Sequence, residues 1–148
     1  MTSKTSDRIL SMLLWTWGGA VYYMLEVVYK TATGNPERIH WSMLVVAVLL
    51  SMVIERCGAE CPWEMTLPMQ ALICTVAITA TELVAGLVLN VWLGLGVWDY
   101  SHLPANFMGQ ICLWFSALWY VLSLIFIPVF DVLKYLVKGG DKPHYSFL

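Results

Sequence analysis

Four long apolar segments, separated by short polar stretches, dominate the sequence. They predict helices over residues 9–29, 40–57, 67–93 and 106–128. At about 1.5 Å per residue, helices of this length can cross a hydrocarbon core of about 30 Å. The second apolar run covers only residues 41–54, so it must recruit His40 and residues 55–57 to reach that length. The pattern therefore predicts an all-α integral membrane protein with four transmembrane helices.

Residues at the two ends of the chain modify this pattern. Lys4 and Arg8 precede the first apolar run as in a signal peptide, but the run is too long and no A-x-A cleavage site follows it, which favours an uncleaved span. Pro128 should kink the last helix before an amphipathic stretch over 129–136, because proline lacks a backbone N–H. We therefore expect one membrane domain over residues 1–136 and a flexible tail over 137–148.

The connection before the last helix is unusually apolar for an exposed loop. The segment GLGVWDYSHLPAN (94–106) contains Gly94 and Gly96 for tight turns and Pro104 near the expected helix start. Irregular backbone at membrane depth is tolerated only where protein or water covers it. We expect a semi-buried, re-entrant loop that lies against the helices.

The composition agrees with a membrane protein. Apolar residues make up 59% of the chain and charged residues 12%, against about 45–50% and 25% in soluble domains. The net charge is −2 and no basic patch is present, which argues against a nucleic-acid partner. The sequence also lacks a G-x-x-x-x-G-K-[ST] loop for nucleotide binding and a G-x-S-x-G nucleophile motif.

The distribution of lysine and arginine predicts the orientation. Six of these residues fall on the side of the two termini and the middle loop: Lys4, Arg8, Arg56, Lys134, Lys138 and Lys142. Two fall on the other side: Lys30 and Arg38. Positive charge is enriched in cytoplasmic loops. We therefore expect a multi-pass protein of the cell membrane with cytoplasmic N- and C-termini.

The four cysteines do not predict a metal site or a disulfide framework. Cys57 and Cys61 form a C-x₃-C in a loop predicted to be cytoplasmic, where thiols stay reduced, and a metal would need two further ligands. Cys74 and Cys112 fall in predicted spans, where cysteine acts as a small apolar residue. We expect no metal and no cofactor.

Polar and small residues recur at helical spacing on one face of three predicted helices. On the third they are Thr75, Thr79, Glu82, Gly86 and Asn90. On the first they are Trp15, Gly19, Tyr22, Glu26 and Tyr29, and on the last Gly109, Leu113, Ser116, Tyr120 and Ser123. Such stripes either let helices approach and bond to one another or line a functional interior.

Two carboxylates within these stripes need a compensating partner. A charged side chain at the centre of a bilayer costs about 2.5–3.5 kcal/mol even on lenient scales. Protonation, a hydroxyl donor such as Tyr22 or Tyr23, Arg38 from the first loop, or a bound cation could each compensate Glu26 or Glu82. By contrast, Glu55-Arg56 is typical of an interfacial pair at a helix end.

The predicted site gathers polar residues in the outer half of the bilayer. The candidates for binding a ligand or ion are Glu26, Glu82, Tyr22, Asn90, Asp99, Asn106 and Gln110. The residues expected to shape the site are Gly19, Gly86, Trp98, Tyr100, Ser101 and Gly109. We expect no catalytic residue, although His102 beside Asp99 could serve as an acid or base.

Several segments carry a family resemblance. WDYSHLPANFMGQI (98–111), TELVAGLVLN (81–90), GGAVYYMLEVVY (18–29) and VIERCGAECP (53–62) are similar to the CmpB-like family of putative ABC-transporter type IV proteins. The resemblance covers roughly residues 15–125 and extends to a vertebrate branch of small transmembrane proteins. It implies a four-helix membrane protein in which both glutamates and the WDYS segment belong together.

Three functions remain open on the sequence alone. The first is a transporter or permease subunit whose acidic site binds a cation, a proton or a substrate amine. Because the chain lacks a nucleotide-binding loop, an ATP-driven version would require an ATPase partner chain. So small a four-helix chain would also need a homo-oligomer to form a transport path. The second is a non-transporting membrane scaffold that docks partner helices. The third is an intramembrane lipid-modifying enzyme with Glu82 or Asp99 as general base.

Overall fold

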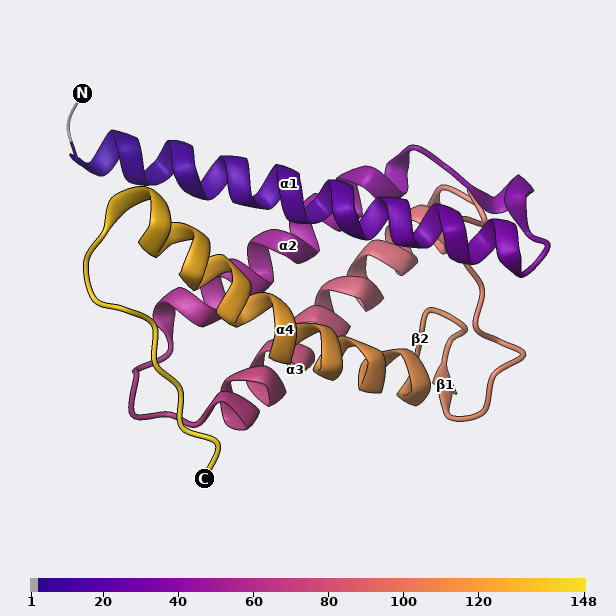
Figure 1. Ribbon diagram of the computed structural model, residues 1–148. Helices are drawn as coiled ribbons and strands as arrows, with labels where there is room; N and C mark the ends of the chain where they lie inside the picture. Colours follow the sequence, from indigo (N-terminus) through magenta and orange to yellow (C-terminus); the bar gives the residue numbers. More distant parts are fainter. Residues whose placement is uncertain (1–2) are drawn as a thin grey trace.

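Four long helices make up most of the computed structural model, which describes residues 3–148 (Figure 1). They are α1 (Ser3–Ala32), α2 (Ser42–Glu60), α3 (Leu67–Gly86) and α4 (Leu113–Lys138). The shorter elements are η1 (Pro36–Arg38), the π-helical η2 (Leu87–Trp92), β1 (Asn106–Phe107) and β2 (Ile111–Cys112). The second helix is shifted toward the C-terminus relative to the expected 40–57.

The two termini lie at the same end of the bundle (Figure 1). An ion pair between Asp7 and Lys138 joins the start of α1 to the end of α4. The backbone N–H of Leu67, at the start of α3, donates to the carbonyl of Ser146 at 2.9 Å. We call this the terminus end. The opposite, distal end carries the α1–α2 connection and the segment 93–112.

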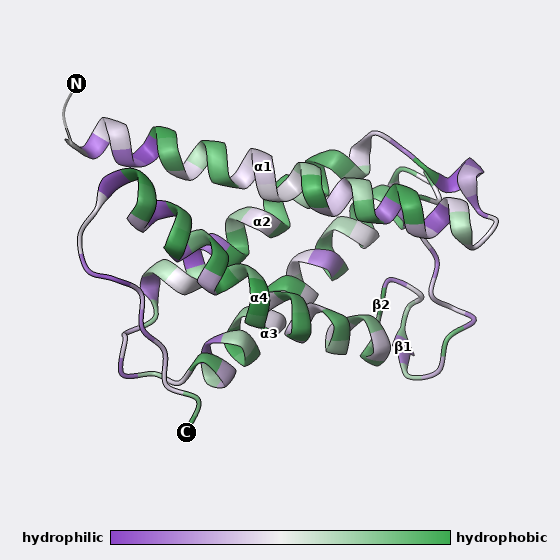
Figure 2. Cartoon of the chain, viewed as in Figure 1, coloured by the Kyte–Doolittle hydropathy of each residue, from purple (hydrophilic) through white to green (hydrophobic). Residues whose placement is uncertain are grey.

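The helices pack in two pairs that α2 joins. α1 packs mainly on α2 and α3 mainly on α4, and α2 also contacts both α3 and α4. α1 and α2 lie in close contact at Gly19, where an added Cβ would lie 2.7 Å from the backbone of Val48. Small residues allow such close contact between membrane helices. Hydrophobic residues dominate α2, α3 and α4, whereas hydrophilic residues lie toward both ends of α1 (Figure 2).

Three helical segments are long and apolar enough to cross a membrane: Ser42–Glu60, Leu67–Trp92 and Leu113–Lys138. Their outward side chains are apolar, including Val76, Val84 and Trp114, the last 75% exposed. A face of this kind suits lipid rather than water. α1 forms the fourth predicted helix. It is not among the three segments that are both long and apolar enough to cross a membrane.

The last helix begins later than expected, at Leu113 instead of residue 106. Residues 106–112 form a short antiparallel pair in which Asn106 is opposite Cys112 and Phe107 is opposite Ile111. The Asn106 side-chain oxygen accepts the N–H of Gly109 at 3.0 Å, and Gly109 has a φ of +68°. Asparagine commonly stabilises turns in this way. The sequence reading missed this turn because the flanking residues are apolar.

The C-terminal segment consists of the end of α4 and a tail that contacts the terminus end. α4 continues through Pro128 to Lys138, as membrane helices often do when neighbouring groups satisfy the freed backbone. The tail, predicted to be flexible, folds back on the terminus end. Tyr145 donates its hydroxyl proton to Asp131 at 2.5 Å, and the His144 ring stacks on Trp63 at 5.1 Å between centroids.

Candidate functional site

Glu82 lies on the face of α3 that points into the bundle, and it is 4% exposed. Tyr100 donates its hydroxyl proton to Oε1 of Glu82 at 3.1 Å, and Trp119 donates its Nε1–H to Oε2 at 3.3 Å. Both donors are neutral. Among residues 3–148, none of the ion pairs includes Glu82. An ionised Glu82 would therefore carry an uncompensated charge.

Glu26, on α1, has a different environment. Its Oε1 lies 3.0 Å from Nζ of Lys30, and its Oε2 accepts the hydroxyl proton of Tyr22 at 3.3 Å. Lys30 is only 5% exposed, and it also donates to the carbonyls of Arg38 and Val97, each at 2.9 Å. These three acceptors match the three N–H donors of an ammonium group. Glu26 is thus neutralised within the protein.

A small cavity brings the two carboxylates together. Its volume is ≈ 10 Å³, which is about the room needed by one water. The cavity is lined by Tyr22, Glu26, Met43, Val46, Leu50, Glu82, Trp98 and Tyr100. We call it the inner cavity. It is formed by α1, α2, α3 and the loop after η2.

A larger pocket opens at the distal end, next to the inner cavity. Its volume is ≈ 370 Å³, and we call it the outer pocket. It is lined by Tyr29, Lys30, Thr33, Asn35, Arg38, Trp98, Asp99, Tyr100, His102, Leu103 and Phe115. Trp98 and Tyr100 line both spaces. These two side chains therefore form the boundary between the outer pocket and Glu82.

Hydrogen bonds of two side-chain amides hold this boundary in place. Asn90 accepts the N–H of Val97 at 2.7 Å and donates to Oε1 of Gln110 at 2.9 Å. The indole N–H of Trp98 donates to the Gln110 carbonyl at 3.0 Å. Asn90 and Gln110, predicted as ligand-binding candidates, thus position the loop instead of lining the inner cavity. Gly86 leaves room for Gln110.

Four further predicted residues shape the turn at the distal end: Asp99, Ser101, Asn106 and Gly109. Asp99 is exposed and accepts the N–H of Ser101 at 2.9 Å, a bond that lowers the pKa of its carboxyl. Asn106 donates to the Leu103 carbonyl at 2.7 Å, and the Gly109 carbonyl accepts the N–H of Tyr100 at 2.7 Å. Asp99 lines the outer pocket, whereas Gly19 lies at the α1–α2 contact.

Tyr100 stays protonated beside the buried carboxylate. Burial, with the negative charge of Glu82 as a further cause, raises the pKa of its phenol well above the usual range. Its ring stacks on Phe115 at 4.5 Å between centroids, which fixes its orientation. The hydroxyl therefore remains a donor to Glu82 at any physiological pH.

Two residues of this site were not among the sequence candidates. Lys30 was counted as a loop residue, although Glu26 and Lys30 have the i, i+4 spacing of a helical ion pair. Trp119 showed no signal, because a tryptophan in an apolar helix resembles any other lipid-facing aromatic residue. Only its contact with Glu82 distinguishes it.

Glu55 also differs from expectation, at the terminus end. It is 2% exposed and pairs with Lys134 at 2.5 Å, not with Arg56. Trp15 donates its Nε1–H to Glu55 at 2.9 Å and Ser11 its hydroxyl proton at 3.3 Å. Arg56 instead pairs with Glu60 on the surface. The interfacial pair predicted for Glu55-Arg56 is wrong, because consecutive residues point to different sides of a helix.

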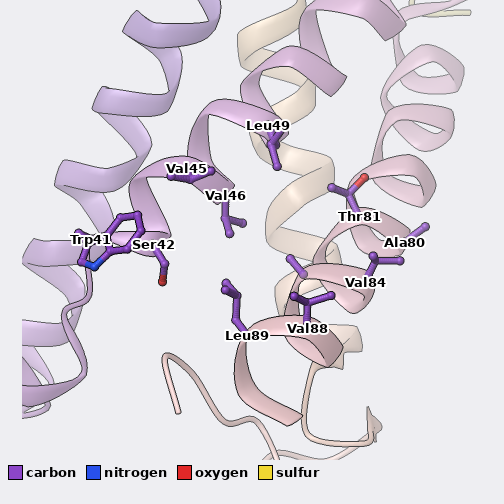
Figure 3. A pocket seen from close by; sticks show the side chains of 11 residues that line it. Trp41, Ser42, Val45, Val46, Leu49, Ala80, Thr81, Val84, Val88 and Leu89 are labelled. Carbon is purple, nitrogen blue, oxygen red and sulfur yellow. The ribbon is translucent and has the colours of Figure 1, made fainter. Parts of the chain in front are cut away.

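An apolar groove of ≈ 610 Å³ runs between α2 and α3 (Figure 3), and neither Glu26 nor Glu82 is among its lining residues. The two hydroxyls on its wall are already bonded: Ser42 to His40 at 2.7 Å, and Thr81 to the Ala77 carbonyl at 2.8 Å. The groove has no charged side chain, and the indole of Trp41 is its remaining polar group. Its surface suits the hydrocarbon chains of a bilayer.

The sequence also matches a known protein family. A family model described as "Putative ABC-transporter type IV" matches residues 9–140, which include most of α1, the other helices and both Glu26 and Glu82. The chain belongs to this family. Together with the three apolar helices, membership identifies a membrane protein of the ABC-transporter-like type. No curated protein and no solved structure matches the chain.

The part of the chain that the structure describes has no arrangement typical of a metal centre. Within residues 3–148, no three His, Cys, Asp or Glu side chains are grouped so as to hold a metal ion. The inner cavity offers the carboxylates of Glu26 and Glu82, the phenols of Tyr22 and Tyr100 and the indole of Trp98. Lys30 and Trp119 contact the two carboxylates but do not line the cavity.

Proposed function

We propose that this family member is the membrane subunit of a transport system in which Glu82 binds a proton. The observation that supports this role most directly is the contrast between the two carboxylates of the inner cavity. Glu26 has an ammonium partner, whereas within residues 3–148 Glu82 accepts from the neutral donors Tyr100 and Trp119 and has no ion-pair partner. A buried carboxylate without a counter-ion is stabilised by gaining a proton.

The size of the inner cavity favours a proton over a substrate amine. A space of ≈ 10 Å³ accommodates about one water, which can deliver a proton to Glu82. An organic amine would require the larger outer pocket of ≈ 370 Å³. We therefore assign proton binding to the inner cavity and propose the outer pocket as the entrance on the distal side.

The wider assembly forms part of this proposal. α1 would act as the fourth membrane span, because it is 30 residues long and packs along α2. Both termini would lie in the cytoplasm of a cell-membrane protein, with the distal end facing outward. Since the sequence has no nucleotide-binding loop, ATP-driven transport would use a partner ATPase chain, and a second copy of this chain could complete the transport route.

Proton uptake into reconstituted vesicles tests the function. A pH gradient is imposed across vesicles that contain a trapped pH-sensitive dye, and the wild type is compared with Glu82→Gln and with Glu26→Gln plus Glu82→Gln. We expect uptake to fall about tenfold or more in both variants, because glutamine cannot carry a proton. Glu60→Gln, at an exposed carboxylate, should match the wild type.

Equal uptake by the wild type and the double variant would overturn the proposal. If the substitutions instead abolish co-purification of partner chains or self-assembly while uptake is unchanged, the scaffold function is supported. Both measurements use the same purified samples, so they separate transport from assembly.

A further inference from the structure

The distal end of the bundle carries a belt of exposed tryptophans. Trp41 precedes α2, Trp92 ends η2 and Trp114 is the second residue of α4. Each of these residues is 70% exposed or more. Tryptophan is enriched where the hydrocarbon core of a membrane meets the lipid headgroups. The outer pocket, whose wall includes Phe115 next to Trp114, therefore lies at the depth of the headgroups.

An apolar surface leads from the outer pocket along α1 and α4. Tyr29 of α1 and Phe115 of α4 both line the pocket and contact each other, with 6.2 Å between ring centroids. One turn further from the distal end, Leu25 is 52% and Leu118 is 45% exposed. Their spacing places Leu25 on the side of Tyr29 and Leu118 on the side of Phe115. This surface suits hydrocarbon chains.

The outer pocket also presents opposite charges that do not neutralise one another. Arg38, Asp99 and His102 line it, and all three residues are exposed. Among residues 3–148, none of the three forms an ion pair, and Asp99 accepts from Ser101. The Ser101 N–H is the main cause that lowers the pKa of the Asp99 carboxyl, and the charges of Arg38 and His102 lower it further. The three groups thus lie within electrostatic range of each other.

Arg38 contributes to the fold through its backbone. Its carbonyl accepts from Lys30 at 2.9 Å, and its N–H donates to the Asn35 carbonyl at 3.1 Å. Lys30 is already bonded to Glu26 and two carbonyls, so it adds no free donor to the pocket. The planar guanidinium of Arg38, in contrast, is available to an anion, and its donors match the oxygens of a phosphate.

We propose that the outer pocket binds phosphoethanolamine, as the headgroup of a phospholipid or as the free molecule. The phosphate accepts hydrogen bonds from Arg38 and His102, and the ammonium group donates to Asp99. In the lipid, the acyl chains lie on the apolar surface along α1 and α4. The pocket volume of ≈ 370 Å³ is within the range of small-molecule sites, about 300–1,000 Å³.

The charges of the pocket favour this headgroup over two other common ones. Phosphatidylglycerol has no cation for Asp99 and would place a negative charge beside it. Phosphatidylcholine has a quaternary ammonium without N–H donors, so it cannot make a charge-assisted hydrogen bond to the carboxylate. The site goes beyond the proposed function, because headgroup binding does not require that Glu82 takes up a proton.

Native mass spectrometry tests the lipid form of the ligand. The purified protein in detergent micelles is mixed with equal amounts of phosphatidylethanolamine, phosphatidylglycerol and phosphatidylcholine that have identical acyl chains, and the lipids retained on the protein are counted. We expect phosphatidylethanolamine to be retained about fivefold or more over each of the others. Isothermal titration calorimetry with free phosphoethanolamine, in lipid-free detergent, tests the free form.

Two variants remove the charges with little change to the fold. Arg38→Gln keeps both backbone bonds of Arg38 but loses the phosphate contact, so binding should fall about tenfold. Asp99→Asn can still accept the Ser101 N–H, but it should abolish the preference for phosphatidylethanolamine over phosphatidylglycerol. Glu37→Gln, at an exposed neighbour of Arg38 that does not line the pocket, should match the wild type. Thermal unfolding verifies that the three variants are folded.

The outcomes distinguish the source of the ligand and the two proposals. A lipid preference that Arg38→Gln and Asp99→Asn remove identifies the headgroup, and binding of the free molecule alone, lost in Arg38→Gln, identifies free phosphoethanolamine. No lipid preference and no calorimetric binding, or equal binding in folded Arg38→Gln, overturns the site. Glu82→Gln leaves every lining residue in place and should bind as the wild type. Its wild-type proton uptake would overturn the proposed function alone.

Discussion

Lys30 and Glu26, one turn apart on α1, form an ion pair of 3.0 Å whose side chains are only 7% and 16% exposed. Surface pairs at this spacing contribute about 0.3–0.5 kcal/mol. This pair is buried, and the ammonium group is also held by the carbonyls of Arg38 and Val97. It therefore fastens α1 to both loops of the distal end.

Lys30→Met should destabilise the protein by about 3 kcal/mol or more, because it leaves a buried carboxylate and two carbonyls without a donor. The free energy of unfolding in a detergent titration measures this. Adding Glu26→Gln should recover part of the loss, since the uncompensated charge disappears. Arg56→Met, at an exposed pair of the same spacing, should change stability by less than about 1 kcal/mol. Equal effects at the two pairs would contradict the burial argument.

Trp119→Phe should weaken the hold on Glu82 while keeping the aromatic contact with Tyr22, whose ring centroid lies 4.8 Å away. The substitution removes one hydrogen bond to a carboxylate, worth about 1.5–3 kcal/mol when the acceptor is charged. Trp114→Phe on the same helix, at an exposed indole, should have almost no effect. Thermal unfolding of the two variants distinguishes them, and a larger loss for Trp114→Phe would refute the assignment.

Gly86→Ala should disturb the loop that carries Trp98. An added Cβ would lie 2.5 Å from Oε1 and 2.9 Å from Cβ of Gln110, so the bond between Gln110 and Asn90 must break. We expect destabilisation of about 1–3 kcal/mol. Combining Gly86→Ala with Gln110→Ala removes the overlap with Oε1 and leaves only that with Cβ, so the two effects should be less than additive. Strict additivity in unfolding titrations would show that the two residues do not interact.

The docked tail provides a pH-dependent prediction. Burial and the bond to Asp131 raise the pKa of the Tyr145 phenol above its usual value. A pKa raised in the folded state stabilises below about pH 10, the unfolded value, and this stabilisation is lost as the pH rises through the folded-state pKa. Docking should therefore persist to pH 10 and weaken only above it.

Fluorescence anisotropy of a label at the C-terminus measures tail docking. Tyr145→Phe removes the donor to Asp131, so its anisotropy should be lower than that of the wild type even at pH 7. Phe147→Ala, at an exposed position, should behave as the wild type. Low wild-type anisotropy at pH 7 would show that the tail is not docked.

The sequence by itself determined the apolar segments and the polar faces. Their length and spacing predicted helices that the structure contains, with shifted ends, because the period of 3.6 residues and the thickness of a bilayer leave few alternatives. The same spacing placed Glu26, Tyr22 and Glu82 on inward faces, and the structure brings them to one cavity. Family membership also followed from local segments.

Only the tertiary structure decided which groups neutralise one another. Glu55 finds Lys134, and Glu82 finds Trp119, across at least 37 residues of sequence, and no local pattern encodes such pairings. Likewise, the turn at Gly109 and the role of Gln110 depend on packing against Gly86. Helix periodicity fixes which side a residue faces, whereas the partner it meets depends on how separate helices cross.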